Sequence, residues 1–234
     1  ELLVALGVGL IACLAIFQVF AVFEGQKRTT TSGGDAQTNG ALALFGIEHD
    51  LRQAGFGINP SAYFGCNVLA WDEQQSGGTA FTLVLAPVII NQGAAGTADS
   101  ITVLYGTNSL LPNPAVLIQT MTTPIVDIMV GNRYGFSAGD VVIAAETGKN
   151  CTLAQVSSLP TGAGQTNNIV HAEGNYADPN SGALIPTRYN KPAGLGVSYT
   201  TNSKLFSLGG SPVNNIYTVQ NGQLMLQQIL SAAS

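Results

Sequence analysis

The stretch ELLVALGVGLIACLAIFQVFAVF, residues 1–23, decides the fold of this chain. After Glu1 it contains no charged residue, and Gln18 is its single polar side chain. At about 1.5 Å of rise per residue, residues 2–23 form roughly 33 Å of helix, enough to cross a bilayer. A cleaved secretory signal has a basic leader, a shorter apolar core and a cleavage site with small residues. Here the sequence continues after Phe23 as EGQKR at 24–28, which has no such cleavage site. We therefore expect a membrane helix that stays on the mature protein.

Glu1 is the unusual residue of this stretch. A carboxylate near hydrocarbon is costly unless it lies at the interface or meets a cation. Glu1 is therefore either a solvated interfacial residue or one half of an ion pair.

The composition bounds the rest of the chain. With 234 residues, 46% of them hydrophobic, 9% charged and a net charge of −5, there is room for one membrane element and one medium-sized domain. The chain has too little basic charge to bind nucleic acid, so we expect no nucleic-acid partner. Beyond the first helix Gly, Thr, Ser, Asn and Gln dominate, which is typical of an exported β-rich domain.

The three cysteines divide unevenly. We expect a disulfide bond between Cys66 and Cys151, which would stabilise the domain by roughly 4 kcal/mol in an oxidising compartment. Cys13 lies inside the apolar helix and is expected to be a small packing residue. Metal binding is the alternative for the pair, but His49 and His171 are isolated and no ligand spacing occurs, so we expect no metal.

The orientation in the membrane shows a conflict. Lys27 and Arg28 directly follow the helix, and the positive-inside rule alone would place that end in the cytoplasm. The expected disulfide and the threonine-rich domain favour the outside. A basic leader that has been removed would resolve the conflict, so we expect the domain outside.

Helical periodicity returns after a polar stretch. Residues 24–38 are polar and glycine-dotted, with Gly33-Gly34 as the expected weak point. An amphipathic helix is predicted over 41–54, ended by Gly55-Phe56-Gly57. Its apolar face is formed by residues at three- and four-residue steps: Leu44, Ile47, Leu51 and Ala54. Residues 1–57 are thus an N-terminal helical region, which is either interrupted or one long helix.

Residues 58–234 are predicted to form a β-rich globular head, which makes the fold class α+β. Strands are expected at 81–90, 100–105, 116–119, 125–130, 140–145, 152–156 and 204–208. Asn221-Gly222 predicts a two-residue hairpin between 216–219 and 224–226. Residues 157–202 are expected to be loop.

The start ELLVAL at 1–6, followed by an unbroken apolar helix, resembles the beginning of a mature type IV pilin, with four residues of the signature lacking before Glu1. Other segments resemble the PilW type of pilin: FEGQKRT at 23–29, LFGIEHDLRQAGFG at 44–57, ADSITV at 98–103, LFSLG at 205–209 and YTVQNGQL at 217–224. Such proteins usually continue with more strand where this chain stops at Ser234. The resemblance implies a long N-terminal hydrophobic α-helix packed on an antiparallel β-rich head.

The resemblance also implies a function and a location. Glu1 would offer its carboxylate to the N-terminal amine of a neighbouring subunit during filament assembly. The partners would be copies of this chain or other pilins and the pilus assembly machinery. The protein would lie in the inner membrane before assembly and in an extracellular filament afterwards.

Two groups of helix residues are candidates for the assembly contacts. Ala5, Gly9 and Cys13 fall four apart on one face, where close helix–helix approach requires small side chains, although this face could equally meet lipid. Phe17 and Phe20, with Phe23, form an aromatic stripe, which we interpret as packing rather than as an electron path.

Other functional classes stay open beside the main filament subunit. They are a minor priming or tip pilin, a secretion-system pseudopilin and a membrane-anchored adhesin-like binding module. An enzyme is not expected, because Thr147-Gly148-Lys149 lacks the glycine that opens a phosphate loop and no other catalytic motif occurs. No cofactor is expected.

Overall fold

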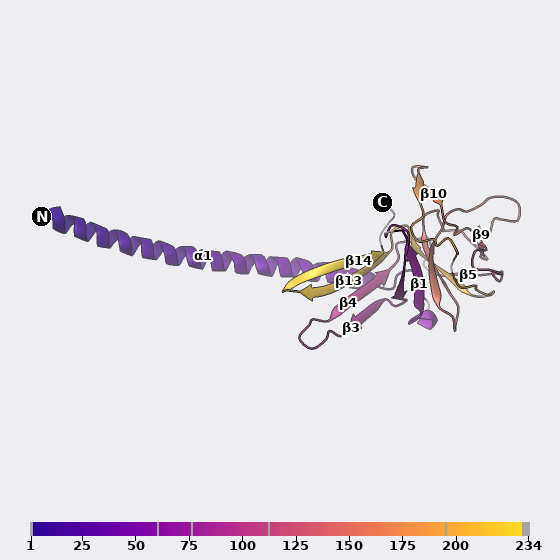
Figure 1. The fold of residues 1–234 in the computed structure, drawn as a ribbon, viewed down its shortest axis with the longest axis horizontal. Coiled ribbons are helices and arrows are strands. Elements are labelled where there is room, and N and C mark those ends of the chain that lie inside the picture. Colours follow the sequence, from indigo (N-terminus) through magenta and orange to yellow (C-terminus); the bar gives the residue numbers. More distant parts are fainter. Residues whose placement is uncertain (1, 60, 76, 112, 195, 231–234) are drawn as a thin grey trace. The chain divides into compact units, whose positions relative to one another are not determined.

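A computed structural model of the chain describes residues 2–59, 61–75, 77–111, 113–194 and 196–230. These divide into two compact units, Glu1–His49 and Asp50–Ser234. The first unit is helical and the second is built from strands (Figure 1). The α+β class, with one long N-terminal helix and a β-rich head, is confirmed.

The helix α1 runs without interruption from Leu2 to Gln53. The weak point expected at Gly33-Gly34 does not interrupt the helix, so residues 2–53 form one long helix. Threonine hydroxyls in this polar stretch donate to carbonyls one turn earlier: Thr29 Oγ1 to Gly25 O at 3.0 Å and Thr30 Oγ1 to Gln26 O at 2.9 Å. A helix satisfies its own backbone groups, so it tolerates glycines that each cost about 1 kcal/mol against alanine.

The last turn of α1 differs from the expected amphipathic face. Leu51, assigned to the apolar face, is 38% exposed, whereas the neighbouring Asp50 is 7% exposed. The helix stops where the sequence predicts, before Gly55 and Gly57, which adopt φ of +83° and +81°. Gly55 N then donates to Leu104 O at 2.9 Å, which starts the attachment to the sheet.

A six-stranded sheet forms the centre of the head, in the order β2-β1-β8-β7-β12-β5. Its strands are β1 Asn67–Asp72, β2 Thr79–Val84, β5 Ala115–Val116, β7 Val141–Ala145, β8 Cys151–Gln155 and β12 Lys204–Gly209. The sequence analysis missed β1. The pair β1–β8 is parallel, unlike the other pairs of this sheet, so the head is not wholly antiparallel.

The second sheet is antiparallel and has the order β14-β13-β4-β3. Its strands are β3 Val88–Asn91, β4 Ser100–Tyr105, β13 Val213–Gln220 and β14 Gln223–Leu230. The single strand expected at 81–90 is two strands, β2 and β3, separated around Pro87 and placed in different sheets. The Asn221-Gly222 turn is confirmed, with both residues at positive φ (52° and 75°) as a two-residue hairpin requires.

Short elements complete the head. A 3-10 turn covers Ser61–Tyr63, β6 Ile128–Met129 pairs with β9 Asn168–Ile169, and β10 Asn175–Ala177 pairs with β11 Leu184–Pro186. The region 157–202, expected to be loop, thus contains three short strands. Pairings of two or three residues leave no periodic signal in a sequence.

The core covers both faces of the six-stranded sheet. Val141, Ile143 and Ala145 of β7 belong to one apolar cluster, and Val142 and Ala144 belong to another. Because successive side chains of a strand point to opposite faces, β7 is buried on both sides. The central sheet therefore forms the rigid interior of the head.

The glycines of the polar stretch of α1 give the first prediction. An added Cβ at Gly33 or Gly34 would meet nothing within 4 Å. We expect Gly33→Ala and Gly34→Ala each to stabilise the helix locally by about 1 kcal/mol, and amide hydrogen exchange of residues 24–40 to slow roughly fivefold in detergent micelles. In contrast, Gly55→Ala should destabilise, because Gly55 has positive φ and its Cβ would lie 3.1 Å from Pro87 Cγ. Faster exchange in the Gly33 and Gly34 variants would contradict the prediction.

Candidate assembly helix and polar clusters of the head

The first part of α1 presents apolar side chains in every direction. The large apolar residues between Leu2 and Phe23 are between 54% and 87% exposed. By length and composition, α1 contains a stretch able to cross a membrane. A helix that is apolar all round needs a cover of lipid or of other helices, which makes residues 2–23 the candidate assembly surface.

The structure brings the five described candidate residues onto one sector of this helix. Four of these residues are spaced four apart along the helix, so each lies about 40° further around the helix axis than the one before: Ala5, Gly9, Cys13 and Phe17. Phe20 lies within the same range of directions. All five are exposed, and the Cys13 thiol is free. Their role in assembly stays a prediction, and Glu1 lies outside the described residues.

The disulfide bond joins the pair expected from the sequence, Cys66 and Cys151, with their Cα atoms 5.9 Å apart. It links the residue before β1 to the first residue of β8, beside the parallel pair of strands. The two cysteines are 85 residues apart, and closing a loop of this length stabilises the folded head by about 4–5 kcal/mol in the chain-entropy model.

A buried carboxylate fixes the last turn of α1 to the four-stranded sheet. We call Asp50, Tyr105, Asn215 and Tyr217 the Asp50 cluster. Tyr105 Oη donates to Asp50 Oδ1 at 3.0 Å, while Asn215 Nδ2 and Tyr217 Oη each donate to Oδ2 at 2.6 Å. Burial and then the nearby Asp50 carboxylate raise the pKa of Tyr105 and Tyr217 to about 12. Both hydroxyls thus stay protonated donors at neutral pH.

The sequence analysis missed this cluster. A signal was available, because Asp50 lies three residues after Ile47 and four before Ala54, on the face predicted to be apolar. A carboxylate on such a face requires buried donors. The donors on β4 and β13 are more than 50 residues away in sequence, so the pattern of the helix does not identify them.

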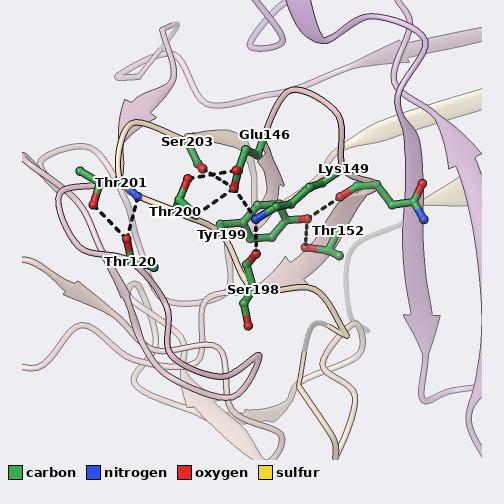
Figure 2. Close-up of polar contacts among 10 residues, drawn as sticks. Thr120, Glu146, Lys149, Thr152, Ser198, Tyr199, Thr200, Thr201 and Ser203 are labelled. Carbon is green, nitrogen blue, oxygen red and sulfur yellow. Dashed lines mark hydrogen bonds and ion pairs between the residues drawn. The ribbon is translucent and has the colours of Figure 1, made fainter.

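A second polar cluster surrounds Glu146, the residue after β7 (Figure 2). Its carboxylate accepts hydrogen bonds from Thr200 N at 2.8 Å and Lys149 Nζ at 2.9 Å, and from the hydroxyls of Thr200 and Ser203 at 3.0 Å. Burial raises the pKa of Glu146, but these hydrogen bonds together outweigh it and lower the pKa to about 2. The cluster joins the β7–β8 turn to the segment 198–203.

The neighbouring Tyr199 extends this attachment toward the disulfide. Tyr199 Oη donates to Asn150 O at 2.9 Å and lies 2.9 Å from Thr152 Oγ1, on either side of Cys151 (Figure 2). Tyr199 is fully buried and belongs to the second apolar cluster of the core. These contacts serve to hold the long loops against the central sheet.

An ion pair holds the segment after β11 to the end of β1. Arg188 Nε and Nη2 donate to the two carboxylate oxygens of Asp72 at 2.9 and 2.8 Å. The hydrogen bonds from Arg188 lower the pKa of Asp72, although burial opposes this. Bidentate pairs of this kind fix geometry, so the role of this pair is structural.

The second histidine of the chain, His171, lies inside the head. His171 is buried, its Nε2 lies 3.0 Å from Val126 O, and burial lowers its pKa. In the ranges that the structure describes, no three His, Cys, Asp or Glu side chains lie close enough to share a metal ion.

No protein-family model, curated protein or solved structure matches this chain. Its function is therefore inferred from its own residues and architecture.

The Asp50 cluster gives a prediction for stability. Asp50→Ala leaves two tyrosine hydroxyls and an asparagine amide without their shared acceptor, so we expect it to lower the free energy of unfolding of the head by about 3 kcal/mol. Urea unfolding followed by the fluorescence of Trp71 measures this. The matched control is Asp35→Ala, on the exposed surface of α1, which should change it by less than about 0.5 kcal/mol. Equal effects of the two variants would refute the assignment.

The Glu146 cluster gives a prediction for pH. The pKa of Glu146 is lower in the folded state than its ordinary value of 4.5, so its contribution to stability is complete above about pH 4.5. It is lost as the pH falls toward 2. We expect Glu146→Gln to be less stable than the wild type at pH 7 and the difference to shrink by pH 2, measured by urea midpoints. Glu173→Gln, at an exposed position, is the control. A difference that stays constant with pH would argue against this account.

Proposed function

We propose that this chain is a structural subunit of a type IV pilus or pilus-like filament. It polymerises through its N-terminal helix and carries the β-rich head on the filament surface. The observation that carries the proposal is the continuous helix α1, whose residues 2–23 are apolar on every side and free of charge, joined in one chain to a disulfide-bonded head.

The apolar surface of residues 2–23 must stay out of water both before and after assembly. Lipid covers residues 2–23 in the inner membrane before assembly, and the helices of neighbouring subunits cover them in the extracellular filament. Each Å² of apolar area so covered is worth roughly 25 cal/mol relative to water. A heterologous contact that does not close on itself produces a helical polymer when it is repeated.

Glu1 and the small residues that follow it have separate roles in this proposal. The Glu1 carboxylate pairs with the N-terminal amine of a neighbouring subunit, which supplies the cation that a carboxylate near hydrocarbon requires. Ala5, Gly9 and Cys13 allow the helices to approach closely, with Phe17 and Phe20 packing beside them. The role of the chain is structural rather than enzymatic.

The finer proposal is a pilin of the PilW type. Its support is the similarity of segments along the chain, above all residues 44–57, which include the buried Asp50. Partners would then include other pilins and the assembly machinery. The helix is common to three kinds of subunit: the main subunit, a minor priming or tip subunit, and a pseudopilin. Their abundance in the filament is what distinguishes them.

The test places a charge on the small-residue sector. An added Cβ at Gly9 would meet nothing within 4 Å in the isolated helix, so Gly9→Lys leaves the fold of the subunit intact. Among packed helices it puts a bulky cation where it has neither space nor partner, so we expect its incorporation into sheared filaments to fall more than tenfold. Thr161→Lys adds the same charge at an exposed loop position of the head and should assemble normally.

Both variants should be recovered from the membrane fraction before assembly, which separates failed assembly from failed insertion. Normal incorporation of Gly9→Lys would rule out the proposed helix contact.

A further inference from the structure

The edge strand β2 has backbone groups that turn away from its partner. Within the described ranges β2 pairs with β1 alone. Leu85 N donates to Cys66 O at 2.9 Å and Gly65 N donates to Leu85 O at 3.0 Å, so the backbone of Leu85 points toward β1. In an antiparallel pair this direction alternates, so Val84, Thr82 and Ala80 direct their N–H and C=O groups outward. All three residues are exposed.

A groove of about 440 Å³ lies along this edge. Consecutive residues 81–84 of β2 line it, which is the pattern of a strand edge. In the four-stranded sheet the lining residues are alternate ones, Ile89 and Asn91 of β3 and Asn214 and Ile216 of β13, which is the pattern of a sheet face. The groove is therefore bordered by a free edge and floored by a sheet.

The floor is a continuous row across the sheet. Ile89 lies opposite Thr102, Thr102 opposite Ile216, and Ile216 opposite Gln227. Residues 227–229 of β14 form the far wall. An extended segment in the groove would thus meet backbone donors and acceptors on one side and apolar and amide side chains beneath it.

The groove is also without free charge. β2 and the four strands of the second sheet contain no charged residue. Arg188 is the charged residue among those lining the groove, and Asp72 holds its guanidinium. Edge strands usually carry charged residues, prolines or bulges that prevent pairing with another chain, and β2 has neither a charge nor a proline. An uncharged strand that entered the groove would not bury an unpaired charge there.

We propose that this groove binds an extended, uncharged strand of a second polypeptide chain. The strand pairs with Ala80, Thr82 and Val84 and lays alternate side chains on the Ile89–Thr102–Ile216–Gln227 row. Backbone pairing supplies the affinity, and the side-chain row selects uncharged residues of moderate size. This assigns to the head a binding site for protein segments, independent of the helix contacts that build the filament.

The test uses the full chain in detergent micelles and a defined probe. The probe is the end-blocked, fluorescein-labelled hexapeptide Thr-Val-Thr-Val-Thr-Val, and fluorescence anisotropy measures its binding. The control peptide carries N-methyl groups at every residue, which removes all backbone donors. We expect saturable binding of the first peptide and at least tenfold weaker binding of the second.

Variants of the edge locate the site. Thr82→Pro removes an outward N–H while keeping the bonds to β1, and Val84→Lys adds a charge at the edge, so each should weaken binding at least tenfold. Thr161→Lys should bind as the wild type does. Non-reduced peptide mapping of Cys66–Cys151 and the fluorescence of Trp71 verify that each variant is folded.

The proposal is overturned if the hexapeptide does not bind saturably, if the N-methylated peptide binds equally well, or if both edge variants retain wild-type affinity. Because binding is measured on micellar subunits, such a result leaves the proposed filament function standing. Normal assembly of Gly9→Lys, which would defeat the proposed helix contact, would likewise leave this groove standing.

Discussion

The need to keep residues 2–23 out of water governs how this protein can exist. Their side chains are apolar around the whole helix, so the helix cannot cover them by itself. Hydrocarbon and a bundle of like helices are both adequate covers, and exchange between them costs little because each is apolar. The same surface therefore suits both a cover of lipid and a cover of like helices.

The head is held by contacts between residues far apart in sequence. The Asp50 cluster attaches the end of α1 to β4 and β13, the disulfide ties β1 to β8, and the Glu146 cluster fixes segment 198–203. Each attachment pairs a carboxylate with donors or closes a long loop. The Asp50 cluster makes the last helical turn part of the folded head.

Local signals predicted part of this architecture. The apolar run, the glycines after residue 54 and the Asn221-Gly222 turn each act over a few residues, and the structure shows a helix, a helix end and a hairpin there. The parallel β1–β8 pair and the burial of Asp50 depend on partners more than 50 residues away. The helix also continues through Gly33-Gly34, because low propensity alone does not interrupt hydrogen bonds that the backbone can complete. The assembly contacts involve other molecules and stay a prediction.

The uncharged sheet has a consequence for the environments in which the protein works. From residue 205 to residue 230 the chain has no charged side chain, and strands β2, β3 and β4 have none either. Dissolved salt at 0.1 M screens the attraction between exposed charges that are more than about 10 Å apart, but it does not screen backbone pairing or apolar contact in this way. Contacts made by these uncharged strands therefore depend little on ionic strength.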